Sequence, residues 1–182
     1  MKMNYVFLAD GFEEVEAMTS VDVMRRAGMP VVTVSINGGL AVTGAHGVTV
    51  MADGLFEEQD YSNAEWLVLP GGMPGATNLV ECEGLCRQLL AHDEAGGRIG
   101  AICASPSVVL AQLGLLEGRH AVCYPGMEAP VPGVEWGDEP VAVDGNVVTG
   151  NGPAAAAAFA LAMVGESLGA AAADQVAAGM LL

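Results

Sequence analysis

Residues 98–111 read "RIGAICASPSVVLA", and this stretch decides the fold of the chain. Its first half is a short apolar run that ends at Ile102, as is typical of a buried strand. A helical pattern begins at Pro106, because proline suits the first turn of a helix. Cys103 lies between the two on a turn flanked by small residues. A strand, a sharp turn that carries a nucleophile and a helix together form a nucleophile elbow.

The segments around this elbow alternate between strand and helix patterns. The chain opens with a strand at Met3–Leu8, a helix at residues 13–27 and a strand at residues 31–36, an order that favours a parallel sheet with right-handed crossovers. Further predicted elements are strands at 66–69 and 120–124, a hairpin at 140–150, and helices at 78–95, 106–113 and from Pro153. Residues 40–53 fit a small hairpin or a pair of edge strands. We expect one α/β domain over residues 1–182, a three-layer sandwich with a mostly parallel, flavodoxin-like sheet and a nucleophile elbow at Cys103.

Composition and charge exclude several classes of function. Hydrophobic residues make up 52% of the 182 residues, enough for a core, and the net charge of −16 argues against binding to a phosphate backbone. The most apolar segment runs from Pro153 to Glu166 and is too short to span a bilayer. Residues 1–12 lack the apolar region and cleavage site of a signal peptide. The four cysteines show neither a CxxC pair nor a secreted framework. We therefore expect a cytoplasmic protein with no nucleic-acid or membrane partner and no metal.

A second motif, "LVLPGGMPG" at residues 67–75, ends another predicted strand. Ligands of open α/β sheets bind beyond the carboxyl ends of the strands, where this motif and Cys103 both fall. The N-terminus of the elbow helix would favour a thiolate and lower the Cys103 pKa. The backbone N–H groups of Gly71 and Gly72 could stabilise an oxyanion. The alternative is that Cys103 only fills the core and that Pro-Gly-Gly is only a turn.

One carboxyl of the first helix differs from its neighbours. Glu13 and Glu14 fit solvated carboxylates at a helix start. Glu16 shares a helical stripe with Phe12 and Ser20 and can turn towards the end of the sheet. An ionised Glu16 would raise the pKa of a neighbouring cysteine, whereas a protonated Glu16 could donate a hydrogen bond to a thiolate. The two groups would then titrate as a coupled pair.

Three segments carry a family resemblance. Residues 8–35 ("LADGFEEVEAMTSVDVMRRAGMPVVTVS"), 67–79 ("LVLPGGMPGATNL") and 101–116 ("AICASPSVVLAQLGLL") resemble the ThiJ/PfpI superfamily, and within it the branch of the Parkinson's-disease protein deglycase and its bacterial relatives. The resemblance implies that Cys103 is a reactive, oxidisable cysteine and Glu16 the buried carboxyl bonded to it. It further implies the backbone donors Gly71 and Gly72 and homodimer contacts at Glu13, Val15 and Pro153.

The sequence departs from the family where histidines are expected. Peptidase relatives place a histidine directly after the cysteine, and here that position is Ala104. The deglycase branch has a histidine where this chain has Tyr124, and His46 occupies a position that often carries arginine. His92 and His120 fit surface residues. The candidate site therefore comprises Cys103, Glu16, Gly71, Gly72 and Ala104, with Tyr124 and His46 as secondary members.

These residues lead to two functional hypotheses. The resemblance implies a homodimeric, cofactor-free glyoxalase or deglycase that acts on methylglyoxal or on glycated thiols and amines. The alternative is an oxidative-stress sensor in which Cys103 is oxidised to a sulfinate. A cysteine peptidase is a poorer match, because no histidine follows Cys103.

Overall fold

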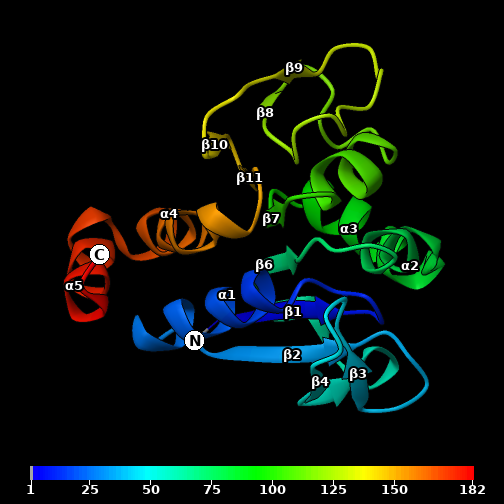
Figure 1. Ribbon diagram of the computed structural model, residues 1–182, viewed down its shortest axis with the longest axis horizontal. Coiled ribbons are helices and arrows are strands. Elements are labelled where there is room, and N and C mark those ends of the chain that lie inside the picture. Colours follow the sequence, from blue (N-terminus) through cyan, green and yellow to red (C-terminus); the bar gives the residue numbers. More distant parts are fainter. Residues whose placement is uncertain (1) are drawn as a thin grey trace.

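The computed structural model describes residues 2–182 and contains a seven-stranded sheet between two layers of helices (Figure 1). The strands run in the order β10-β11-β7-β6-β1-β2-β5, and all neighbours are parallel except the β10–β11 hairpin. Their bounds are β1 (Met3–Leu8), β2 (Val31–Ser35), β5 (Gly54–Leu55), β6 (Ala64–Leu69), β7 (Arg98–Ile102), β10 (Val141–Asp144) and β11 (Val147–Gly150). The predicted mostly parallel α/β sheet is confirmed.

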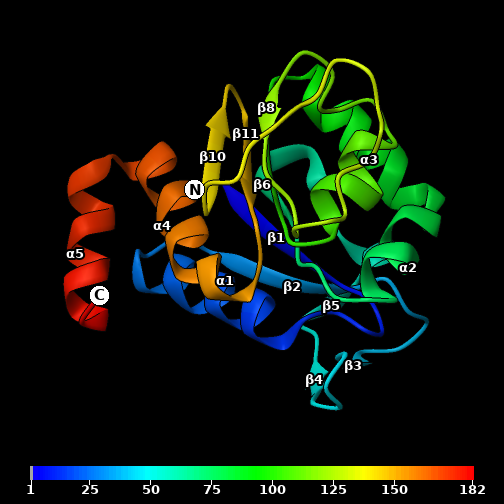
Figure 2. The same ribbon diagram turned by 45° about the horizontal axis from the view of Figure 1, so that its top comes forward.

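Side-chain alternation along the strands divides the core between the two faces of the sheet. In β1, Val6 and Leu8 pack in the cluster that contains α1 (Glu14–Arg26) and α4 (Ala156–Leu168). Tyr5 and Phe7 point the other way, towards α2 (Gly75–Glu81), α3 (Glu83–Glu94) and the elbow helix (Pro106–Ala111). The outermost helix, α5 (Ala170–Met180), packs on α4 (Figure 2). This arrangement confirms the predicted three layers.

Two small sheets lie outside the main one. β3 (Ala41–Thr43) and β4 (Thr49–Met51) form the predicted antiparallel hairpin, and β8 (His120–Ala121) pairs in parallel with β9 (Glu135–Trp136). Short 3₁₀ turns occur at Phe56–Glu58, Tyr61–Asn63 and Pro153–Ala155. Across residues 2–182, none of the helices has both the length and the apolar composition that a bilayer crossing requires.

Three local predictions were wrong. The strand expected at 120–124 stops at Ala121, because the Val122 N–H donates to the Thr149 hydroxyl (3.0 Å) and the Tyr124 N–H to the Cys103 carbonyl (2.8 Å). The helix expected at 78–95 is two helices, since Cys82 adopts an extended conformation. The elbow helix is a π-helix that ends at Ala111, a form that recurs at functional sites.

Candidate active site

Cys103 follows β7 directly and has a left-handed backbone, with φ at +63°. This conformation costs a residue with a side chain about 1–2 kcal/mol. Backbone hydrogen bonds on both sides hold it: the Cys103 N–H donates to the Gly150 carbonyl, and its own carbonyl accepts from the Tyr124 N–H, each at 2.8 Å. The Ser105 hydroxyl ties the elbow to the Pro70 carbonyl at 2.5 Å. The predicted nucleophile elbow is present, and its strain is local to the sulfur-bearing residue.

Two backbone amides approach the Cys103 side chain. The amides of Gly72 and Ala104 hydrogen-bond the Cys103 side chain. Gly71 contributes differently, because its N–H donates to Glu16 Oε2 at 2.8 Å. A Cβ at Gly71 would stand 2.5 Å from the Cys103 Cβ and 2.8 Å from Glu16 Oε2, so only glycine fits there. Gly72 and Ala104 thus present the donors to the sulfur, whereas Gly71 positions the carboxyl.

Glu16 lies on the buried face of α1 with no exposed surface. Its carboxyl is within hydrogen-bonding reach of the Cys103 side chain. Its Oε1 atom is buried, and no group in residues 2–182 makes a hydrogen bond to it. Burial raises the pKa of Glu16 to about 7, and the charge of Glu13 adds to the effect, while the hydrogen bonds from Gly71 and Cys103 oppose it. Glu16 is therefore poised to exchange a proton near neutral pH.

The protonation of Cys103 differs from the prediction. Burial, together with the negative charge of Glu16, raises the pKa of the thiol to about 12, because the amides of Gly72 and Ala104 only partly compensate. The helix N-terminus was expected to lower this pKa, but the loss of hydration outweighs it. Above neutral pH, Cys103 and Glu16 hold one proton between them. This proton lies on the Cys103 sulfur, beside the Glu16 carboxylate that can accept it.

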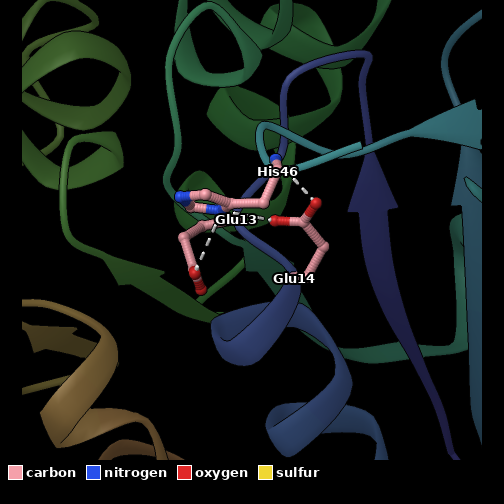
Figure 3. A group of neighbouring side chains, drawn as sticks. All are labelled: Glu13, Glu14 and His46. Atoms are coloured by element: carbon pink, nitrogen blue, oxygen red, sulfur yellow. Dashed lines mark hydrogen bonds and ion pairs between the residues drawn. The ribbon is translucent and has the colours of Figure 1, made fainter. Parts of the chain in front are cut away.

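The secondary residues lie at the rim of the site. Tyr124 is 47% exposed and, with Pro125 and residues 151–154, lines an open hollow of about 360 Å³. His46 lies on the β3–β4 turn and contacts Glu14 and Glu13 rather than Cys103 (Figure 3). The carboxylates of Glu13 and Glu14 are nearly buried, so the prediction that they are solvated was wrong. The docked hairpin covers them, and no local pattern at the start of α1 indicates that.

His92 also differs from its prediction. It is buried at the end of α3, and its Nε2 atom lies 3.2 Å from the Glu65 carbonyl and 3.1 Å from the Arg98 carbonyl. The ring thus joins α3 to β6 and β7. Its polar neighbours in the sequence suggested an exposed position, but the helix end turns it towards the sheet.

Comparisons with known proteins agree with this geometry. The DJ-1/PfpI family profile matches residues 2–166. Protein DJ-1 homolog B of Arabidopsis thaliana is 38% identical over 157 residues, which cover 86% of this chain and 36% of that protein. Protein dj-1beta of Drosophila melanogaster is 36% identical over 183 residues and is covered to 97%. A deglycase of Pyrococcus abyssi is 34% identical over 152 residues, 81% of this chain and 89% of that protein.

The relatives differ in how much of their length this chain spans, and several solved structures share its fold. The chain spans 36% to 40% of the length of the two Arabidopsis relatives. Among solved structures, a mutant of a DJ-1 superfamily protein from Salmonella typhimurium has a TM-score of 0.95 at 34% identity, with 100% of this chain and 98% of that chain covered. An oxidised Toxoplasma gondii DJ-1 has a TM-score of 0.94 at 36% identity and the same coverage. The similarity thus extends over the elbow and the sheet together.

Proposed function

The chain belongs to the DJ-1/PfpI family, and from this premise we propose that it is a cofactor-free glyoxalase or deglycase that acts on small reactive carbonyls through Cys103. The observation that carries the proposal is the buried carboxyl of Glu16, which reaches the Cys103 side chain. A thiol needs a base to become a nucleophile, and a carboxyl with a pKa of about 7 is suited to that task. The relative named a deglycase supports the reaction class.

The proposed reaction with methylglyoxal begins with addition. The Cys103 sulfur attacks the aldehyde carbon while its proton passes to the Glu16 carboxylate, and the carbonyl oxygen becomes an alkoxide. The backbone amides of Gly72 and Ala104 are the donors that would stabilise this oxyanion, whereas the Gly71 N–H is engaged by Glu16. Glu16 then passes this proton to the alkoxide, which gives a hemithioacetal and restores the Glu16 carboxylate.

Isomerisation and hydrolysis complete the proposed cycle. Glu16 removes the proton from the former aldehyde carbon, and the hydroxyl proton moves to the neighbouring ketone oxygen. Glu16 then returns its proton to the neighbouring carbon, so that the hemithioacetal becomes a lactoyl thioester. Water then cleaves the thioester, which releases lactate and restores the thiol. The sum is methylglyoxal plus water to lactate, with no net oxidation and no cofactor.

The experiment compares lactate formation from methylglyoxal by the purified chain and three variants. Cys103→Ser and Glu16→Gln are expected to lower the rate by at least about 100-fold, the usual minimum contribution of a general base. Cys123→Ser is the matched control, since Cys123 is also buried but has no hydrogen bond to a carboxyl. Equal lactate formation by the wild type and Cys103→Ser would reject the proposal.

A second candidate function is redox sensing, favoured by the Glu16 carboxyl, which is within reach of the Cys103 side chain and has one buried oxygen without a hydrogen bond. Two equivalents of peroxide would convert the Cys103 thiol to a sulfinic acid and two waters. The sulfinate could accept hydrogen bonds from the Gly72 and Ala104 amides and share a proton with Glu16. Intact-mass analysis after mild peroxide treatment should find two added oxygen atoms on Cys103, and fewer in Glu16→Gln. Oxidation confined to other cysteines would reject this function.

We also propose that the protein forms a homodimer through the start of α1. Val15 is 53% exposed, and the nearby hairpin exposes Val48 and Met51, so an apolar surface is available. Glu13 and Pro153 are the other proposed contacts. Sedimentation should give a dimer for the wild type and a monomer for Val15→Asp, whereas identical masses for both would reject this interface.

A further inference from the structure

A carboxylate-imidazole cluster lies beside the elbow and takes no part in the proposed reaction. It consists of Glu13, Glu14 and His46, which meet where the β3–β4 turn docks on the start of α1 (Figure 3). Within residues 2–182, it is the one group of three His, Cys, Asp or Glu side chains close enough to share an ion. Its three ligand atoms all lie within 4.8 Å of one another.

The backbone orients both carboxylates in the same way. One oxygen of Glu14 accepts from the N–H groups of His46 (2.8 Å) and Val48 (3.3 Å). One oxygen of Glu13 accepts from the Glu16 N–H at 2.7 Å. Each carboxylate is left with a second oxygen that faces the His46 ring. Hydrogen bonds of this kind orient the ligands of metal sites.

The free oxygens match the spacing of a metal site. His46 Nδ1 lies 2.9 Å from Glu14 Oε2 and 3.9 Å from Glu13 Oε1. Ligands bound tetrahedrally at about 2.0–2.1 Å stand roughly 3.3 Å apart, between these two separations. Glu13 is only 8% exposed, and its Oε1 atom faces the His46 ring at a distance too long for a hydrogen bond. An ion between the three atoms would bind Glu13 Oε1, Glu14 Oε2 and the His46 nitrogen together.

We propose that Glu13, Glu14 and His46 bind one divalent transition-metal ion of the Zn²⁺ type. Two carboxylates and a neutral imidazole carry a charge of −2, which the ion neutralises, and the His46 side chain is 72% exposed in the single chain. The ion would replace the proton that His46 and Glu14 share, and binding would release it. Three protein ligands leave at least one coordination position for water. The site is independent of the proposed glyoxalase or deglycase activity.

The test uses the full-length chain after treatment with a chelator. Titration with Zn²⁺ by calorimetry should give one equivalent per chain, and Co²⁺ should give visible absorption bands without a sulfur-to-metal band. His46→Ala should weaken binding more than about 100-fold, because loss of an outer-shell partner alone costs 10–100-fold. Glu13→Gln should also weaken it, while leaving the Glu14 bonds to the hairpin in place.

Two controls separate this site from other ligands. His120→Ala removes another partly exposed histidine, one that pairs with Glu139, and should bind Zn²⁺ like the wild type. Cys103→Ser should do the same, because no thiol belongs to the site. The proposal is overturned if wild-type protein binds no stoichiometric Zn²⁺, if His46→Ala binds as tightly as wild type, or if the loss follows Cys103→Ser. Circular dichroism of each variant verifies that the fold is retained.

Discussion

Replacement of Glu16 by glutamine should stabilise the protein above neutral pH while it removes the proposed base. The Glu16 pKa rises from an ordinary 4.5 to about 7 on folding, chiefly because the carboxyl is buried. At about 1.4 kcal/mol per pKa unit, the ionised carboxylate costs the folded state about 3 kcal/mol. Because the pKa of this carboxyl is raised on folding, its full contribution to the stability is present below about pH 4.5. This contribution is lost as the pH rises through about 7. Glutamine stays neutral and can still accept the Gly71 N–H, so Glu16→Gln escapes this loss.

Urea unfolding at pH 5 and pH 8 measures the effect. We expect similar stability of wild type and Glu16→Gln at pH 5, and a gain of about 3 kcal/mol for the variant at pH 8, or roughly 6–12 °C in Tm for a chain of this size. Glu14→Gln is the matched control on the same helix. Burial tends to raise the pKa of Glu14, but hydrogen bonds from His46 and Val48 outweigh it and lower the pKa. Loss of the Glu14 carboxylate should therefore destabilise the protein at pH 8. A Glu16→Gln variant that is no more stable at pH 8 than at pH 5, each relative to wild type, would refute the reasoning.

Three further predictions concern the elbow and its rim. Gly71→Ala should lose most lactate formation and about 1–3 kcal/mol of stability in urea, because its Cβ would overlap Cys103 and Glu16. In the control Gly38→Ala, the added Cβ meets no atom within 4 Å, so neither activity nor stability should change. Cys103→Gly should unfold at higher urea than Cys103→Ala, by about 1 kcal/mol, since glycine adopts a φ of +63° freely; the reverse order would show that the elbow is unstrained. Tyr124→Phe should keep kcat within about threefold, because a hydroxyl contributes less than a positioned base, and a 100-fold loss would assign the hydroxyl a direct part in catalysis.

The layered fold was predictable because its signals are local. Met3–Leu8 forms β1 with the predicted bounds, and Asp144-Gly145 marks the turn of the β10–β11 hairpin. The stripe on which Glu16 lies correctly indicated that this carboxyl faces the sheet. Such patterns report which face of an element is buried, and burial determines the layers.

The chemistry at the sulfur was less predictable, because it depends on contacts between distant segments. The dipole of the elbow helix is visible in the sequence, but the dehydration of Cys103 comes from the packing of the whole sheet end. Likewise, Glu14 and His46 are 32 residues apart and meet only because a hairpin folds back on α1. Tertiary contacts of this kind leave no periodic trace in a single sequence.

The two edge strands of the main sheet, β5 and β10, have a consequence for aggregation at high protein concentration. β5 contains only two residues, which is too short to template a strand from another molecule. At the opposite edge, the Asp144 carboxylate of β10 accepts a hydrogen bond from the His120 N–H at 2.8 Å. The Asp144 carbonyl accepts another from the Arg119 guanidinium at 3.0 Å, so the segment at β8 covers this end of β10. At β5 and at Asp144, a neighbour's backbone therefore finds little free strand to extend. The mostly parallel sheet should therefore resist fibril growth at these edges, while the carboxyl ends of its strands stay available for the candidate active site.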